Sequence, residues 1–110
     1  MDSMLVKMRE YLEMETEIAF EEFKDYYEQV INHLQNSYDD MTNDELFTAK
    51  FILDIVSSNS KSRAMKKGPE SKKYKKYAEK TSFWSEAIGF RLKNAGLSQE
   101  EIDAGVAKNA

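Results

Sequence analysis

The chain of 110 residues contains no cysteine, one proline and four glycines. Without cysteine it has no disulfide bond, no thiolate metal ligand and no cysteine nucleophile. Because proline and glycine disfavour helices most strongly, their scarcity leaves few places at which a helix must end. No alternation of apolar and polar residues persists long enough to indicate a β-strand. The sequence therefore predicts an all-α fold.

Long apolar segments are also missing. The longest apolar runs are only three residues long, and one of them, Phe51–Leu53, is interrupted by Asp54. All are far shorter than the roughly 20 residues of a membrane span. Residues 1–4 show no basic region followed by an apolar run, so no signal peptide is visible. We therefore expect a cytoplasmic protein without membrane association. Its Lys-, Glu-, Asn- and Tyr-rich composition is typical of AT-rich bacterial or phage genes.

The apolar spacing predicts a first helix over residues 3–35. Met8, Ala19 and Val30 repeat every eleven positions, which is typical of a nearly straight helix. A second helix is expected to begin at the capping box of Thr42 and Glu45. It should run without a break through the serine-rich residues 57–60 and end at Gly68 and Pro69, with Gly68 in a left-handed cap.

A third helix is predicted from Pro69 to about Asn94, with a seam of apolar and small residues facing its neighbours. Gly96 should end it, and Ser98 with Glu101 forms a second capping box. The predicted architecture is an elongated up-down-up three-helix bundle with a short C-terminal fourth helix. One domain covers residues 1–104, and residues 105–110 are expected to form a flexible tail. The seam consists of Tyr74, Tyr77, Thr81, Trp84, Ile88, Leu92 and Ala95.

Charge is divided unevenly along the chain. Residues 1–56 carry 14 acidic and four basic side chains, whereas residues 57–95 carry 11 basic and three acidic ones. The basic residues gather around the turn between the second and third helices, so the molecule should have a positive tip that attracts an anionic neighbour. The residues predicted to meet this neighbour are Lys61, Arg63, Lys66, Lys67, Lys72, Lys73, Lys75 and Lys76.

Three neighbours are compatible with this basic hairpin. Antiparallel packing would bring the first-helix acids Glu10, Glu13 and Glu17 beside it, which would neutralise it inside the monomer. An acidic protein partner is the second possibility. Nucleic acid is the third: lysines of the hairpin 61–80 would contact phosphates, and the tyrosines among them would stack on bases. Those tyrosines lie on the apolar seam, and the net charge of −4 is unusual for a dedicated nucleic-acid binder.

The second helix is apolar around most of its circumference. Such a helix must be covered on most sides, and two neighbouring helices would leave part of it free. An uncovered apolar patch marks an interface, so we expect a homo-oligomer. The residues predicted for this apolar interface are Phe47, Phe51, Ile55, Phe83 and Phe90.

No catalytic, metal or cofactor pattern emerges. The single histidine, His33, follows Glu28 by five positions, whereas di-metal helical bundles use a Glu-x-x-His spacing. Glu13, Glu17 and Glu21 share a helix face opposite the apolar stripe, which is typical of a solvated surface. We predict a non-enzymatic helical protein–protein interaction or regulatory protein that self-associates. The alternative is a nucleic-acid-binding protein that uses the Lys-rich hairpin.

Overall fold

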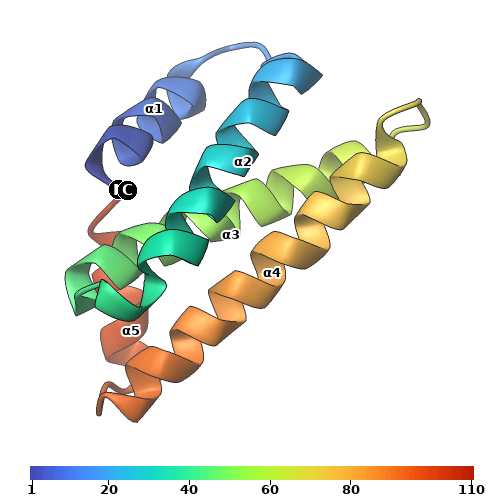
Figure 1. Cartoon of the computed structure of the whole chain (residues 1–110). Helices are drawn as coiled ribbons and strands as arrows, with labels where there is room; N and C mark the ends of the chain where they lie inside the picture. Colours follow the sequence, from blue (N-terminus) through green and yellow to red (C-terminus); the bar gives the residue numbers. More distant parts are fainter.

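A computed structural model describes all 110 residues and contains five α-helices (Figure 1). There is no β-strand, so the predicted all-α fold is confirmed. The molecule is elongated, with extents of 43 × 26 × 25 Å. A short 3₁₀ turn at Tyr38–Asp40 links the second and third helices. The helices are α1 (Asp2–Glu13), α2 (Phe20–Ser37), α3 (Asn43–Met65), α4 (Ser71–Asn94) and α5 (Gln99–Ala107).

The antiparallel pair of α3 and α4 forms the centre of the molecule, and the two helices pack along most of their length (Figure 1). Both capping interactions of the predicted Thr42 box are present, so α3 begins where the sequence indicated. It continues through residues 57–60 as predicted, because Ser57 turns toward α4 and its hydroxyl shares a 2.7 Å hydrogen bond with Ser82. Completely buried aliphatic residues form the core between the helices: Leu34, Leu46, Ile52, Leu53, Ile88, Leu92 and Ile102.

The single first helix predicted over residues 3–35 is wrong. The backbone is extended at Met14 (φ −73°, ψ 140°) and at Ala19 (φ −66°, ψ 159°), and α1 folds back along α2 (Figure 1). Long-range packing overrides the local helix preference here. In the folded-back position Met8 is buried, and the Tyr26 hydroxyl donates a 2.7 Å hydrogen bond to the Met4 carbonyl.

The turn between α3 and α4 lies at one extremity of the molecule and differs in detail from the prediction (Figure 1). Gly68 does not adopt the left-handed conformation, and α4 begins at Ser71 rather than at Pro69. The Ser71 hydroxyl closes the turn by donating a 2.6 Å hydrogen bond to the Ala64 carbonyl. Gly96 is the only residue with positive φ (99°), and it ends α4 as predicted.

The C-terminal helix α5 begins at the predicted capping box of Ser98 and Glu101 and packs against α3. Gly105 lies so close to Phe47 that a Cβ atom at this position would stand 2.6 Å from the ring. Within residues 105–110, the Asn109 side chain accepts a 2.9 Å hydrogen bond from the Thr48 hydroxyl. The mobility of this tail stays a prediction.

An aromatic layer joins α2 to α4. The rings of Tyr27 and Tyr77 stack with 4.1 Å between their centroids, and Phe23 meets Tyr74 edge-on at 5.1 Å. Tyr74 is buried and Tyr77 is half-buried, so both tyrosines of the predicted seam belong to the core side of α4. In this arrangement both rings pack against aromatic side chains of α2.

Two tyrosines, Tyr26 between α1 and α2 and Tyr77 in the aromatic layer, predict a loss of stability at alkaline pH. Desolvation by burial raises the pKa of Tyr26 and of Tyr77 above the ordinary value of about 10. The unfolded chain therefore ionises these phenols first, and the free energy of unfolding should fall as the pH rises above about 10. Chemical denaturation at about pH 8 and about pH 11 measures this difference. Tyr26→Phe should reduce this loss of unfolding free energy. An equal loss in the wild type and in Tyr26→Phe would contradict the role given to Tyr26.

Candidate functional site

One face of α4 points away from the core along the whole helix. Lys72, Lys76, Phe83 and Phe90 follow one another at spacings of four, seven and seven residues, which places them on one side of the helix. All four are exposed, and the two phenylalanines are 63% and 73% exposed. These four residues, called the α4 stripe below, span about 27 Å. The opposite side of α4 is buried and carries Tyr74, Ala78, Thr81, Ser85, Ile88 and Leu92.

The stripe combines lysines at one end with the only exposed phenylalanines of the protein at the other. Covering an exposed phenylalanine contributes about 2 kcal/mol, so a partner that covered both rings would gain appreciably. The remaining exposed large apolar side chains lie on other elements and are not aromatic. The stripe is therefore a surface on which exposed apolar and positively charged groups coincide, and the exposed acids Glu79 and Glu86 lie on the same side of the helix.

The other residues of the predicted apolar interface lie elsewhere. Phe47, Phe51 and Ile55 of α3 are half-buried and pack against the core cluster. The Phe47 ring is covered by α5 at Gly105, so α5 covers part of the surface that the sequence left free. Of the five residues predicted for this interface, the structure leaves only Phe83 and Phe90 largely open to solvent.

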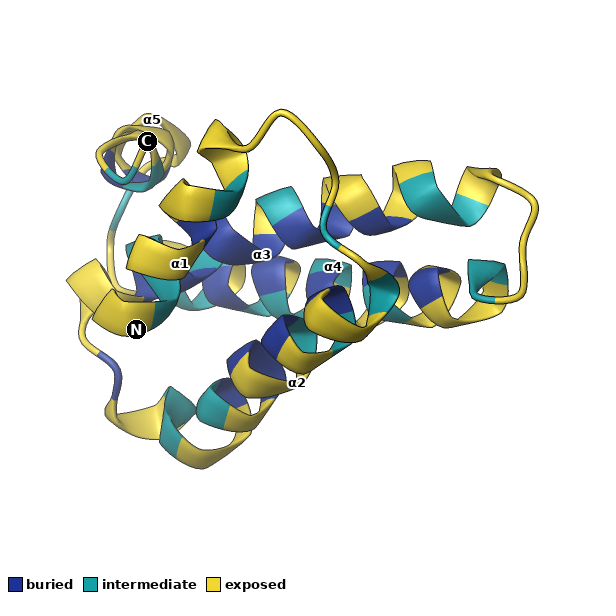
Figure 2. Ribbon diagram, turned by 90° about the horizontal axis from the view of Figure 1, so that it is seen from above, coloured by how far each residue is buried: buried dark blue, intermediate teal, exposed yellow.

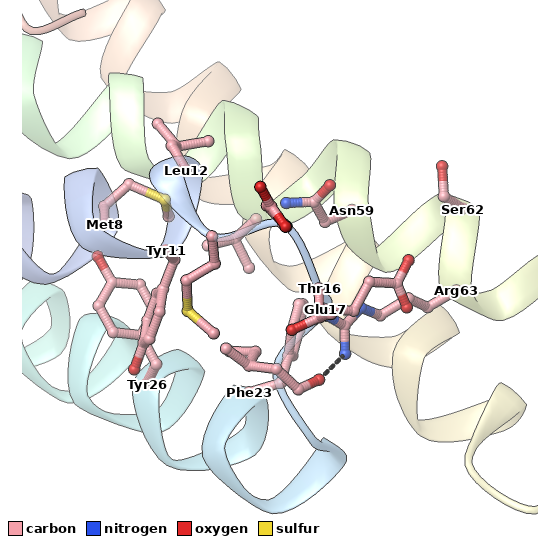
Figure 3. Close-up of a pocket in the computed structure, with 14 residues that line it drawn as sticks. Met8, Tyr11, Leu12, Thr16, Glu17, Phe23, Tyr26, Asn59, Ser62 and Arg63 are labelled. Carbon is pink, nitrogen blue, oxygen red and sulfur yellow. Dashed lines mark hydrogen bonds between the residues drawn. The ribbon is translucent and has the colours of Figure 1, made fainter.

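The basic tip is formed mainly by lysines, because Arg63 is turned inward. The Arg63 guanidinium donates hydrogen bonds to the Ile18 carbonyl (2.9 Å) and to the Tyr74 hydroxyl (3.0 Å). It also lies over the Phe23 ring, 4.5 Å from its centroid. Arg63 thus fastens the extended segment 14–19 to α3 and α4, and it does not present its charge to a partner. Figure 3 shows this contact in the lower right of the pocket.

Of the three acids expected to neutralise the tip, only Glu17 forms an ion pair with it. Its carboxylate lies 3.2 Å from the Lys66 amine, and because both side chains are mostly exposed the pair contributes about 0–1 kcal/mol. Glu10 pairs instead with Lys7, within α1. The break in the first helix explains the difference, because it moves most of the α1 acids away from the tip. The tip lysines with no carboxylate within ion-pair distance are Lys61, Lys67, Lys72, Lys73, Lys75 and Lys76.

A pocket of about 270 Å³ lies between α1, segment 14–19, the start of α2 and α3 (Figure 3). Its apolar lining includes Met8, Phe23 and Tyr26, and its polar rim includes Glu17 and Arg63. The pocket exists because the chain turns back at residues 14–19. Sequence reasoning missed it, since a continuous helix over residues 3–35 has no such recess.

The remaining polar groups include one cluster between α3 and α4 and a single histidine. Asp54 lies 3.5 Å from the Lys50 amine, in an ion pair within α3. Ser85 of α4 donates a hydrogen bond to Asp54 and accepts one of 2.8 Å from Lys50, which links this pair to α4. Burial lowers the pKa of His33, and its Nε2 atom has no hydrogen-bond partner. No three acidic or histidine side chains are grouped to hold a metal ion. None of the five helices combines the length and apolar character needed to cross a bilayer.

Two adjacent residues of α4 predict contrasting effects on stability. Trp84 is half-buried and meets the Tyr38 ring edge-on at 5.2 Å, whereas Phe83 faces solvent. We expect Trp84→Ala to lower the free energy of unfolding by about 3 kcal/mol, because it removes most of a packed indole. Phe83→Ala should change it by less than about 1 kcal/mol. Urea denaturation of both variants checks this, and equal effects would mean that α4 is rotated from the orientation described.

No protein-family model, no curated protein and no solved structure matches the chain. The α4 stripe is the most distinctive feature of the molecular surface.

Proposed function

We propose that this chain is a non-enzymatic interaction protein whose α4 stripe binds another protein. The observation that carries the proposal is the alignment of Phe83 and Phe90 with Lys72 and Lys76 on one exposed side of α4, which packs along α3. A complementary partner is a helix that carries apolar residues on one side with carboxylates beside them. Such a partner covers the two rings and pairs with the lysines. The absence of cysteine suits a reducing compartment, so a cytoplasmic location is part of the proposal.

The stripe favours a protein over nucleic acid as the main partner. Apolar cover for Phe83 and Phe90 is what a protein surface supplies, whereas the tyrosines that would stack on bases are already packed against α2. The net charge of −4 also means that the molecule as a whole repels a polyanion. The exposed lysines of the hairpin 61–80 support nucleic acid as the second candidate, because phosphate contacts need only positive charge.

The same stripe supports the proposal of self-association. If two copies place their α4 helices antiparallel, Phe83 of one copy meets Phe90 of the second copy, which gives a symmetric contact. We expect sedimentation equilibrium at micromolar concentrations to show a dimer. The double substitution Phe83→Ser and Phe90→Ser should weaken this dimer at least about tenfold. An unchanged dimer in that variant would place the contact on another surface.

Affinity capture from the source cell tests the proposed partner. The full chain is compared with Phe83→Ser/Phe90→Ser and with a tip control, Lys61→Gln/Lys67→Gln, in which both substituted lysines are exposed and lie outside α4. We expect the wild type and the control to capture one acidic protein, and the stripe variant to lose it. This capture should persist after nuclease treatment. Nuclease-sensitive material that is lost with the tip control would instead favour the nucleic-acid function.

A further inference from the structure

The extended backbone conformation of segment 14–19 differs from the helix that its own residues favour. Its six residues, Met-Glu-Thr-Glu-Ile-Ala, include several of the best helix formers and neither glycine nor proline. No side chain caps the start of α2 at Ala19, and α1 ends at Met14 without a left-handed residue. Amides at the start of α2 and carbonyls at the end of α1 therefore lack helical partners. The segment is extended because of the contacts around it, and nothing in its local sequence requires a break.

A straight helix over the same region agrees both with the helix preference of residues 14–19 and with the spacing of the apolar residues. If residues 14–19 were helical, α1 and α2 would join into one helix over residues 2–37, about 54 Å long. About nine further backbone hydrogen bonds would form, donated by the amides of residues 14–22. Met8, Ala19 and Val30 would then continue one stripe without a shift in phase. The chain therefore has two helical arrangements available over residues 2–37.

The contacts that hold α1 do not require α1 to come from the same chain. The seat of α1 consists of α2, α3 and the C-terminal residues. In this seat Met8 is buried, and the Met4 carbonyl accepts the Tyr26 hydroxyl. The Arg9 guanidinium donates a 3.0 Å hydrogen bond to the Asn109 carbonyl. Straightening removes α1 from its own seat and uncovers the apolar lining of the pocket in Figure 3. An α1 helix from a second copy can cover this lining with the same contacts.

We propose that α1 is exchanged between two copies of the chain. In the exchanged dimer, residues 2–37 of each copy form one straight helix, and each α1 occupies the seat of the other copy. The seat contacts are kept and the hinge gains its helical hydrogen bonds. The opposing terms are the lost freedom of two molecules and the loss of the contacts of Arg63 with Ile18 and of Lys66 with Glu17 at the hinge. The exchanged form grows with concentration because two copies must meet to form it. Exchange of an identical element is a low-cost route to a dimer. It does not use the α4 stripe, so it is separable from the proposed function.

Substitutions at Thr16, in the middle of the hinge, should shift the exchange in opposite directions. Thr16→Ala favours the straight helix and Thr16→Gly disfavours it. Because each dimer contains two hinges, the Ala–Gly difference in helix propensity predicts dimerisation constants that differ roughly thirtyfold. Both variants are made in the Phe83→Ser/Phe90→Ser background, which removes the stripe contact. Thr16 is exposed, so neither substitution disturbs the core.

The distance between the ends of the two helices distinguishes exchange from every other dimer. Because the chain has no cysteine, spin labels attach only at Asp2→Cys and Asn36→Cys, two exposed positions. Labelled chain diluted into unlabelled chain reports the distance within one copy. The folded-back form gives a short distance (Figure 1), and the straight helix gives about 50 Å.

We expect the Thr16→Ala dimer fraction to show the distance of about 50 Å. This fraction should increase with concentration and fall in Thr16→Gly. A Thr16→Ala protein that stays monomeric at every concentration overturns the exchange. So does a dimer that keeps the short distance. In the chain with Phe83 and Phe90 intact, a dimer that keeps the short distance and is lost in Phe83→Ser/Phe90→Ser supports the stripe contact alone, so the two proposals fail separately.

Discussion

Arg63→Ala is expected to lower the free energy of unfolding by about 2–4 kcal/mol, although arginine is ordinarily a surface residue. The substitution removes the hydrogen bonds to the Ile18 carbonyl and the Tyr74 hydroxyl and uncovers the Phe23 ring. Hydrogen bonds from a charged donor contribute more than neutral ones, and the stacked guanidinium also excludes water. Urea denaturation measures the change.

The matched control for Arg63 is Lys67→Ala, which removes an exposed positive charge at the same end of the molecule. We expect this control to change the free energy of unfolding by about 0.5 kcal/mol or less. Equal small effects of the two substitutions would contradict the structural role of Arg63. They would mean that its side chain is exposed like those of the tip lysines.

Leu53→Ala is expected to be more damaging, with a loss of about 3–5 kcal/mol. Leu53 is completely buried in α3, and truncation leaves a cavity in the centre of the helix pair. Leu12→Ala is the comparison, because Leu12 of α1 is 53% exposed and should contribute less than about 1 kcal/mol. Thermal or chemical denaturation distinguishes them. A loss below about 1 kcal/mol for Leu53→Ala would mean that α3 does not lie at the core.

Local signals in the sequence located most helix boundaries. The capping boxes at Thr42 and Ser98 and the positive-φ glycine at Gly96 need only neighbouring residues, so they are readable without a structure. The break at residues 14–19 has no local signal. It depends on long-range contacts such as that of Arg63 with Ile18, residues that are 45 positions apart. Sequence periodicity cannot reveal a contact of this kind.

A second set of long-range contacts was equally invisible. The Arg91 guanidinium donates hydrogen bonds to the carbonyls of Tyr38 and Met41 and lies over the Tyr38 ring. It thereby fixes the connection between α2 and α3 onto α4. Nothing in the spacing around Arg91 distinguishes it from a solvated arginine near a helix end, which is the ordinary position for such a residue.

The candidate site was predictable only where it depends on helical spacing or on charge counts. Helical spacing places Phe83 about 100° around α4 from Trp84, so the seam containing Trp84 leaves Phe83 outside it. Charge counting identified the tip lysines but could not separate Arg63 from them. A guanidinium can be hydrogen-bonded and stacked in a partly buried position, and this property does not appear in a charge pattern. The cover that α5 gives Phe47 depends on the close approach of Gly105.

The central claim is that the α4 stripe is the binding surface. Its most direct test is the dissociation constant of the captured partner for four proteins: the wild type, Lys72→Gln/Lys76→Gln, Phe83→Ser/Phe90→Ser and the tip control Lys61→Gln/Lys67→Gln. We predict that each stripe variant binds at least about tenfold more weakly, and that the control binds as the wild type does. Stripe variants that bind with wild-type affinity, or a control that is weakened as much as they are, would contradict the claim.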